Sequence, residues 1–327
     1  MRPLTHGDIK AAADRITGRI RPVTLAPVDA DAFPGDDRSA APSTVWLALE
    51  FMQHTGSFKA RGAQNFIQAH REAGTLPDAG VTIASGGNAG LACAWAARQQ
   101  GVRATVFLPA NAPEVKVTRL RGYGADVRLV GSEYAEALAA CEEFTRTTGA
   151  LASHAYDHPL IAAGAGTLLE EIRHRVPDLD TVIVAVGGGG LFAGVATAAQ
   201  HHGIRTVAVE PENCRALNAA MEAGAVIDVA VDSVAADSLG APRTSAMALH
   251  AARHDLVRSV LVPDSEIISA RQALWDHRRL AVEHGAATAL AALTGRVYRP
   301  ELGEKVCVVV CGANTDPSDL VRRPEAP

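Results

Sequence analysis

The sequence predicts an α/β fold built from mainly parallel strands covered by helices and divided between two domains. Short β-branched runs are each followed by glycine and then by an alanine-rich segment, as in VTIASGGNAGLACAWAARQQG, ATVFLPANAPEVKVTRLRGYG and DTVIVAVGGGGLFAGVATAAQHHG. This alternation is typical of βαβ units. The runs TVIVAV and VCVVV are apolar throughout, which fits strands covered on both faces. The chain has 327 residues, enough for two domains of the usual ~150 residues.

The expected elements follow the alternation along the chain. Strands are expected at 81–83, 104–108, 181–186, 206–210 and 306–310. Helices are expected at 91–100 and from residue 191 onward. The segment 34–43 is expected to be a loop, and the tail 315–327 is expected to be loosely held.

Turn signals near Gly149 indicate a domain boundary. The chain is expected to enter a small domain near residue 50 and to leave it near residue 150. We therefore expect a large domain from 1–49 and 150–327 and a small domain from 50–149.

The composition favours a protein that handles small molecules. Apolar residues make up 48% and charged residues 20%, with a formal net charge of -5, which does not indicate a nucleic-acid or polybasic membrane partner. The chain shows neither a secretion signal nor an apolar run of about 18 residues, so a cytoplasmic location is expected. The five cysteines are scattered and form no CxxC pair, which predicts reduced thiols rather than disulfides or a zinc ribbon.

Lys59, in the stretch HTGSFKARGA, is one of only four lysines among 31 basic residues. Arginine stays charged, whereas a desolvated lysine loses its proton and becomes a nucleophile or a Schiff-base partner. The sequence therefore marks Lys59 as a candidate catalytic residue. The alternative interpretation is an exposed lysine near a turn.

The stretch VAVGGGGLFAG places four glycines between a buried strand expected to end at Gly187 and a helix expected to begin after Gly190. Successive backbone N–H groups at a helix N-terminus form a phosphate-binding loop. No Gly-Lys-Ser/Thr follows, so this is not a Walker A loop. A dinucleotide site is the alternative, because residues 188–193 satisfy G-x-G-x-x-A and Glu210 ends the next strand. This segment alone leaves both interpretations open.

A second glycine loop, ASGGNAG at 84–90, also joins a strand to a helix. Its N–H groups suit a carboxylate, and Asn88 adds a neutral donor and acceptor. A hydride-transfer enzyme needs one pyrophosphate loop. Pyridoxal phosphate chemistry on an amino acid needs a phosphate site, a carboxylate site and a lysine. Two anion sites and Lys59 therefore favour pyridoxal phosphate as the cofactor.

In their order along the chain, these motifs resemble those of the fold-type II pyridoxal-phosphate enzymes, and specifically of the serine/threonine dehydratases. TGSFKARGA is similar to the lysine motif, SGGNAG to the substrate-carboxylate loop, GGGGL to the cofactor-phosphate loop and CGAN to the terminal strand that faces the pyridine nitrogen. The resemblance spans about residues 44–314. It implies two domains like those of tryptophan synthase β, the large one binding the cofactor and the small one closing on the substrate.

The resemblance implies a role for each matching residue. Lys59 is expected to hold the cofactor covalently, Phe58 to pack beside its ring, and Asn88 to hydrogen-bond its 3-hydroxyl oxygen. The phosphate is expected to bind the backbone of Gly187, Gly188, Gly189, Gly190 and Leu191. The substrate carboxylate is expected to be bound by Ser85, Gly86, Gly87, Asn88 and Ala89. Cys311 is expected to face the pyridine nitrogen, where a neutral thiol is a weak partner. Glu283 and the segment 236–245 also match positions near the cofactor.

The reaction implied is dehydration and deamination of L-serine, L-threonine or a related β-hydroxy amino acid, with Lys59 as both cofactor anchor and base. A serine racemase or a β-replacement enzyme is the alternative, and an NAD-dependent oxidoreductase a remote one. In serine racemases the position of Gly86 is serine, which argues against racemisation here. The resemblance also implies a homodimer. It implies no C-terminal regulatory domain, because about a dozen residues follow the last motif.

No metal site is expected. Some relatives bind a divalent cation through an acidic residue like Glu210 and a nearby aspartate, but here Cys214, Arg215 and Ala216 follow. His250 and His254 are spaced i, i+4 but lack the glutamate of a zinc motif. The pair 201–202 is expected at a helix end, where a cation is electrostatically favoured.

Overall fold

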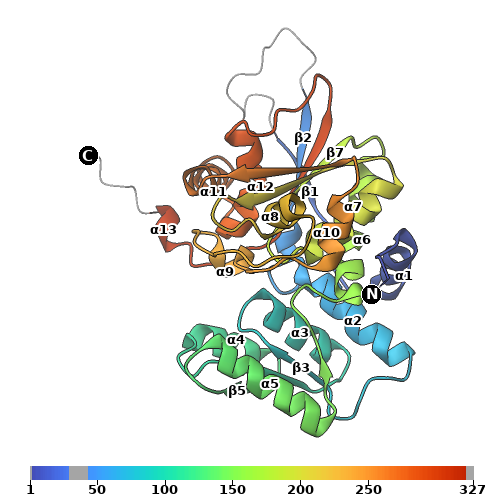
Figure 1. Ribbon diagram of the computed structural model, residues 1–327, viewed down its shortest axis with the longest axis vertical. Helices are drawn as coiled ribbons and strands as arrows, with labels where there is room; N and C mark the ends of the chain where they lie inside the picture. The colour runs from blue at the N-terminus through green and yellow to red at the C-terminus, as the bar shows by residue number, and fades with distance from the viewer. Residues whose placement is uncertain (1, 29–42, 322–327) are drawn as a thin grey trace.

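The computed structural model describes residues 2–28 and 43–321 and contains two sheets, one above the other in Figure 1. The larger sheet has the order β1-β2-β10-β7-β8-β9. Its strands are β1 Leu25–Pro27, β2 Thr44–Ala48, β7 Thr181–Ala185, β8 Arg205–Pro211, β9 Val257–Val262 and β10 Lys305–Val309. The smaller sheet has the order β5-β4-β3-β6. Its strands are β3 Val81–Ala84, β4 Ala104–Leu108, β5 Asp126–Leu129 and β6 Leu151–Ala152.

Every strand pair is parallel except β1 with β2. The side chains of β7 and the interior of β10 are fully buried, as the apolar runs of the sequence predict for strands covered on both faces. The predicted α/β class with mainly parallel sheets is confirmed.

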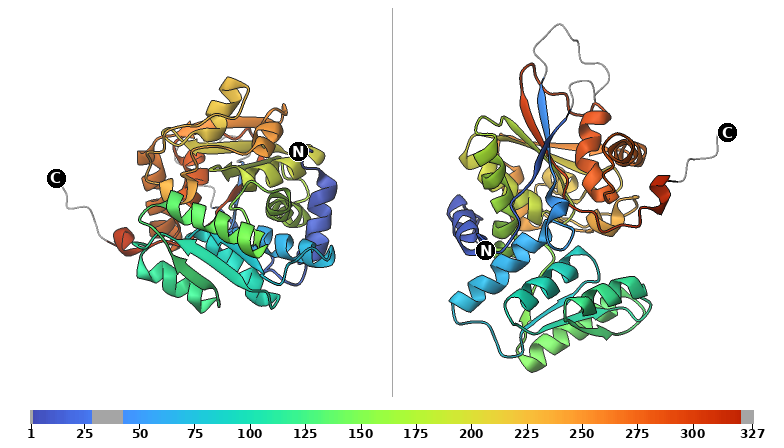
Figure 2. Two further views of the ribbon diagram at one scale, coloured as in Figure 1. Left: turned by 60° about the horizontal axis from the view of Figure 1, so that its bottom comes forward. Right: turned by 180° about the vertical axis from the view of Figure 1, so that it is seen from behind.

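Helices cover both faces of the larger sheet (Figure 2). On one side lie α1 His6–Ile16, α6 Pro159–Arg175 and α7 Gly190–His201, and on the other α11 Asp264–Arg278 and α12 His284–Thr294. Shorter helices complete this part: η1 Glu50–Met52, α8 Ala216–Ala223, α9 Ala236–Leu239, α10 Ala246–Ala252 and α13 Ser318–Val321. The apolar side chains between these layers form one large core.

The smaller sheet has its own core on each face. Its helices are α2 Lys59–Glu72, α3 Asn88–Gln99, α4 Glu114–Gly122 and α5 Tyr134–Thr148. Successive side chains of β4 point to opposite faces, so Val106 belongs to the core beneath α3, and Phe107 to the separate cluster beneath α5. The helix α2 packs against α6 as well as α3, which joins the two parts of the molecule.

Several element boundaries differ from the sequence-based expectations. The strand β7 ends at Ala185, before the glycines begin, and α7 already starts at Gly190. The tail predicted to be loose contains α13, where Arg271 Nη1 lies 2.6 Å from Asp319 Oδ2. No local pattern in the sequence predicts that the guanidinium of Arg271 is buried. The predicted loop 34–43 lies outside the described residues except for Ser43.

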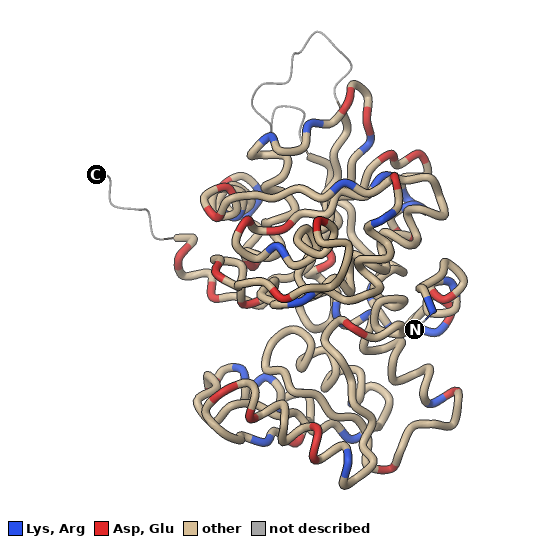
Figure 3. Tube along the Cα trace, in the orientation of Figure 1, with Lys and Arg blue, Asp and Glu red and all other residues tan. Residues whose placement is uncertain are grey.

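The predicted domain boundaries remain a prediction, because strand pairing does not by itself define domains. The strand β6 pairs with β3 although it follows the predicted boundary at 149. Basic and acidic residues are interspersed along both parts of the chain (Figure 3). Within the described ranges, no helix has the length and apolar character needed to cross a bilayer.

Candidate active site

Two adjoining pockets lie between the sheets, and together they contain every site residue that the sequence predicts. Lys59, Asn88 and Ser238 line both pockets. The first pocket is also lined by Phe58, Tyr156, Glu283, Cys311 and the loop 187–191. The second is also lined by the loop 85–89, Lys116, Arg119 and Asn314. The site therefore has an inner part lined by the glycine loop and an outer part bounded by the predicted carboxylate loop.

Lys59 is the first residue of α2 and points into both pockets. The segment before it is tied to the end of β10, because Ser57 pairs with Gly312 and the Phe58 N–H donates to the Cys311 carbonyl at 2.9 Å. The Lys59 Nζ donates to the Ala155 carbonyl at 3.0 Å. Burial lowers the pKa of Lys59 to about 8, against the opposing charges of Cys311 and Glu283. About a fifth of this amine is therefore neutral near pH 7.4, far more than for a solvated lysine.

A network of buried ion pairs surrounds Arg61, two residues after Lys59 in the first turn of α2. The guanidinium of Arg61 is fully buried, with Nε 2.5 Å from Glu50 Oε1 and Nη1 2.6 Å from Glu171 Oε1. Its Nη1 also donates to Thr167 Oγ1 at 3.1 Å. These contacts join the first turn of α2 to η1 and α6. They fix the direction from which Lys59 enters the site.

The four-glycine loop closes tightly around the N-terminus of α7. Gly189 is the N-cap and has φ +90°, a conformation that favours glycine. A Cβ on Gly188 would lie 2.4 Å from the ring of Tyr156, and one on Gly189 would lie 2.4 Å from Ala248 Cβ. The hydroxyl of Thr244 is buried without a hydrogen-bond partner and would lie 2.9 Å from that second Cβ. Backbone N–H groups at a helix N-terminus and an unpartnered hydroxyl beside them are groups that suit a phosphate.

Asn88 lies in a chain of polar side chains beside Lys59. Its Nδ2 donates to Glu283 Oε1 at 2.9 Å, and its Oδ1 accepts from Asn314 Nδ2 at 2.6 Å. Burial raises the pKa of Glu283 to about 7 and that of Cys311 to about 12. The Cys311 side chain is therefore a neutral thiol at the bottom of the pocket.

The outer pocket carries positive charge at its rim. Lys116 Nζ lies 3.1 Å from Asp237 Oδ1, and Arg119 donates to Asn314. Asn88 begins α3, so the predicted carboxylate loop directly precedes a helix N-terminus. This position favours an anion.

For some residues, little in the sequence predicts that they line the site. Tyr156 lies between two histidines whose Nδ1 atoms accept backbone N–H groups: His154 from Asp157 at 2.8 Å and His158 from Leu160 at 3.1 Å. These hydrogen bonds hold the turn before α6, which is a structural role. Ser238 and Thr244 come from the segment 236–245, which the resemblance indicates only as a whole.

Glu210, the alternative ribose-binding residue, is buried and does not face the glycine loop's pocket. Its two carboxylate oxygens accept the N–H groups of Leu217 and Asn218 at 2.7 and 2.8 Å. These bonds hold the start of α8. The pair His250 and His254 also does not share a helix, because α10 ends at Ala252.

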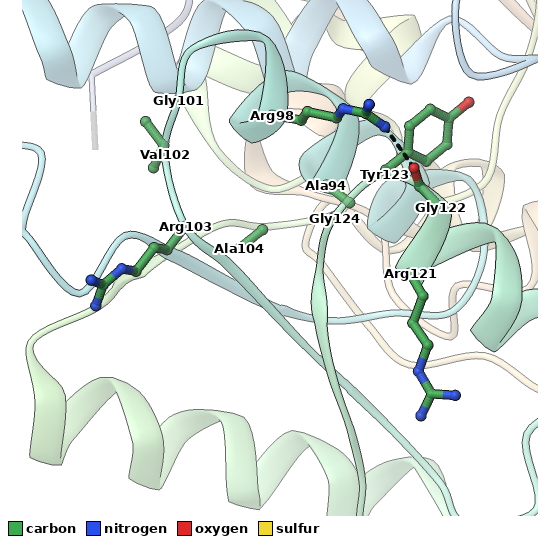
Figure 4. Close-up of a pocket in the computed structure, with 10 residues that line it drawn as sticks. All are labelled: Ala94, Arg98, Gly101, Val102, Arg103, Ala104, Arg121, Gly122, Tyr123 and Gly124. Atoms are coloured by element: carbon green, nitrogen blue, oxygen red, sulfur yellow. Dashed lines mark hydrogen bonds between the residues drawn. The ribbon is translucent and has the colours of Figure 1, made fainter.

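A further pocket lies in the smaller part, away from Lys59 (Figure 4). It is bounded by the ends of α3 and α4 and the start of β4. Arg98 Nη1 donates to the Gly122 carbonyl at 2.7 Å, while Arg103 and Arg121 point in different directions (Figure 4). It contains none of the predicted site residues and shows no convergent polar groups.

Comparison with known proteins agrees with this site. Residues 27–312 match the family described as pyridoxal-phosphate dependent enzyme. An L-threonine ammonia-lyase of Geobacter sulfurreducens is 35% identical over 311 residues, 94% of this chain and 75% of that protein. A human serine dehydratase-like protein is 36% identical over 283 residues, 83% of this chain and 85% of that protein. The structure of maize serine racemase matches with a TM-score of 0.88 and 28% identity over 98% of this chain and 96% of that chain.

The chain therefore belongs to the pyridoxal-phosphate-dependent enzymes of fold type II. Within that family its curated relatives include a threonine ammonia-lyase and a serine dehydratase-like protein, in agreement with the resemblance of the sequence motifs. The pocket fits the cofactor. It combines a buried amine, a glycine loop too tight for a Cβ and an unpartnered hydroxyl beside that loop.

Proposed function

We propose that this enzyme removes the β-hydroxyl and amino groups of L-serine, L-threonine or a related β-hydroxy amino acid and forms a 2-oxo acid and ammonia. The observation on which this rests most is the position of Lys59, which lines both the pocket of the glycine loop 187–191 and the pocket of the loop 85–89. Bound pyridoxal phosphate supplies an aldehyde for covalent attachment and an electron sink for the bond broken at Cα.

The residues of the chain have separate roles in this proposal. The backbone N–H groups of 187–191 and the Thr244 hydroxyl hold the phosphate, Phe58 packs beside the ring, and Asn88 orients it. The loop 85–89 binds the substrate carboxylate. Lys59 Nζ takes the Cα proton. Burial lowers the pKa of this amine to about 8, and a hydrogen bond to the Ala155 carbonyl orients it. The Cys311 thiol stays protonated beside the ring. The Cα proton and the β-hydroxyl together leave as one water molecule, and hydrolysis of the released product by a second water yields the 2-oxo acid and ammonia.

The test is a substrate panel with the purified holoenzyme. Serine, threonine, 3-hydroxyaspartate and phenylserine are supplied separately, and 2-oxo acid and ammonia are measured in parallel. Equal amounts of both products from at least one substrate support the proposal. Reduction of a nicotinamide nucleotide without ammonia release would instead support the oxidoreductase alternative.

Racemisation is the second candidate, since maize serine racemase is a structural neighbour. Gly86 provides no side chain to carry a proton on the opposite face of the substrate. A Cβ there would lie 2.4 Å from Leu108 Cδ2, so the local packing also excludes serine without adjustment. We expect the unmodified enzyme to form no D-serine from L-serine by chiral chromatography, and Gly86→Ser with Leu108→Ala to form a measurable amount. Appreciable D-serine from the unmodified enzyme would overturn the choice of elimination over racemisation.

The cofactor loop yields a prediction about affinity. Gly189→Ala is expected to weaken pyridoxal phosphate binding tenfold or more, because the methyl group enters the loop and a positive φ costs about 1–2 kcal/mol. Fluorescence titration of the apoenzyme measures this. Gly203→Ala is the matched control, since Gly203 has φ +71° just beyond the other end of α7 and open space at its Cβ. An equal loss of affinity in both variants would show that backbone strain alone is responsible.

The pKa of Lys59 predicts how cofactor uptake depends on pH. An amine attacks an aldehyde in its neutral form. Since burial lowers the pKa from 10.5 to about 8, the uptake rate of the apoenzyme should rise as the pH increases through about 8 and then level off. Stopped-flow absorbance measures this rate. A rate that continues to climb far above that pH would indicate an ordinary, solvated lysine.

We also propose that the enzyme is a cytoplasmic homodimer with cofactor-binding residues 1–49 and 150–327 and substrate-closing residues 50–149. The five cysteines are free and buried, which agrees with a reducing compartment. The dimer is implied by the family resemblance, and light scattering coupled to size exclusion tests it.

A further inference from the structure

Three histidines from distant parts of the chain meet beside α6. The helices α1, α6 and α7 form one layer on the larger sheet (Figure 2). His6 is the first residue of α1, His201 is the last residue of α7, and His202 follows it. One ring nitrogen of each lies within 4.8 Å of the others. Glu170 of α6 lies among them, with Oε1 3.1 Å from His6 Nε2 and 3.0 Å from His202 Nε2. The proposed reaction uses none of these residues.

The local backbone explains how the two neighbouring histidines come close together. Consecutive residues inside a helix point about 100° apart. His202 is the C-cap of α7, with φ -101° and ψ 5°, so the chain turns at this point. The ring centroids of His201 and His202 are 4.8 Å apart, and the His6 and His201 rings stack at 3.8 Å. The cluster is therefore compact without a continuous sequence motif.

The distances are close to those of a four-coordinate metal. Bonds of about 2.0–2.1 Å in a tetrahedral site place the donor atoms about 3.3 Å apart. Glu170 Oε1 already lies near that distance from two imidazoles. The three nitrogens lie within 4.8 Å of one another, so the widest pair must shorten by up to about 1.5 Å. His201 is exposed and can supply this movement, whereas the side chains of His6, His202 and Glu170 are only 23%, 16% and 24% exposed.

The surrounding charges are mixed. The C-terminal end of α7 favours a cation, and Glu170 adds a negative charge. Arg173 opposes a metal, since its Nη1 lies 3.4 Å from His202 Nε2 and 3.8 Å from Glu170 Oε2. Its side chain is 33% exposed, so it can turn toward solvent. Imidazole with one carboxylate is a donor set typical of Zn²⁺ and neighbouring divalent transition metals.

We propose that His6, His201, His202 and Glu170 form a zinc-binding site that fastens α1 to α6 and α7. The site is separate from the proposed active site, because His201 ends the twelve-residue helix that begins at Gly190, about 17 Å along its axis. The proposal does not depend on which reaction the enzyme catalyses.

The test is calorimetric titration of chelator-treated holoenzyme with zinc chloride. We expect one saturable site per chain with micromolar affinity, weakened at least tenfold by His6→Ala with His202→Ala. His250→Ala, which removes an exposed histidine of α10, is the matched control and should bind as the unmodified chain does.

Thermal unfolding provides a second measurement. Saturating zinc should raise the melting temperature of the unmodified enzyme and of His250→Ala by about 2 °C or more, but not that of the double variant. Unchanged 2-oxo acid formation by the double variant, without zinc, would show that it folds. Equal zinc affinity in the double variant, or no saturable binding by the unmodified enzyme, would overturn the proposal.

Discussion

Lys59→Ala is expected to lower 2-oxo acid formation by about a thousandfold or more and to abolish the covalent link to the cofactor. The amine is both the attachment point and the proposed acceptor of the Cα proton. Among its neighbours, the Cys311 thiol has a pKa near 12, Asn88 does not titrate, and the Glu283 carboxyl, with a pKa of about 7, cannot form the imine link. The loss should therefore appear in both binding and turnover.

Borohydride trapping followed by peptide mass spectrometry measures the link directly. The unmodified enzyme should carry the reduced cofactor on Lys59 and lose its yellow colour on reduction. Lys116→Ala is the matched control, since this lysine lines the outer pocket and pairs with Asp237. It should keep the cofactor on Lys59. Retained turnover by Lys59→Ala, or trapping on another lysine, would refute the proposed role.

Arg61→Ala is expected to lower the free energy of unfolding by about 3–5 kcal/mol. The substitution removes the cation between Glu50 and Glu171 and leaves Glu50 buried without its main partner. Burial already raises the pKa of Glu50, so the variant must either protonate this carboxyl or let in water. Both responses loosen the first turn of α2 next to Lys59.

Urea denaturation of the holoenzyme measures this loss. Arg146→Ala provides the control, because Arg146 pairs with Glu143 on α5 with both side chains more than half exposed. An exposed pair contributes up to about 1 kcal/mol. Comparable losses of unfolding free energy in the two variants would show that the buried ion pairs of Arg61 stabilise the protein no more than an exposed pair does.

The sequence predicts a feature well where a short segment determines it. The glycine loop at 187–190 is one example, because its backbone conformation and the helix after it are local properties. The prediction that Lys59 is the reactive residue also rests on local signals, since the surrounding motif and the scarcity of lysine are both visible in the chain. The ends of strands and helices are predicted less closely: β7 ends at Ala185, two residues before the predicted end at Gly187.

Features that depend on residues far apart in the sequence cannot be predicted from a short segment. Arg61 resembles any basic helix residue until Glu50 and Glu171 are placed around it. Glu283 is indicated only by family resemblance, and its contact with Asn88 joins residues 195 positions apart. The histidine cluster was missed, because the pair at 201–202 gives no indication that His6 packs against it.

By itself, then, the sequence determined the α/β class, the order of the motifs and the choice of lysine, because periodicity and glycine conformation act over a few residues. The tertiary structure alone decided which side chains share a pocket and how strongly each is desolvated. The pKa of Lys59 is the plainest case. Its shift comes from burial between two sheets, and burial is a property of the packed chain rather than of any segment.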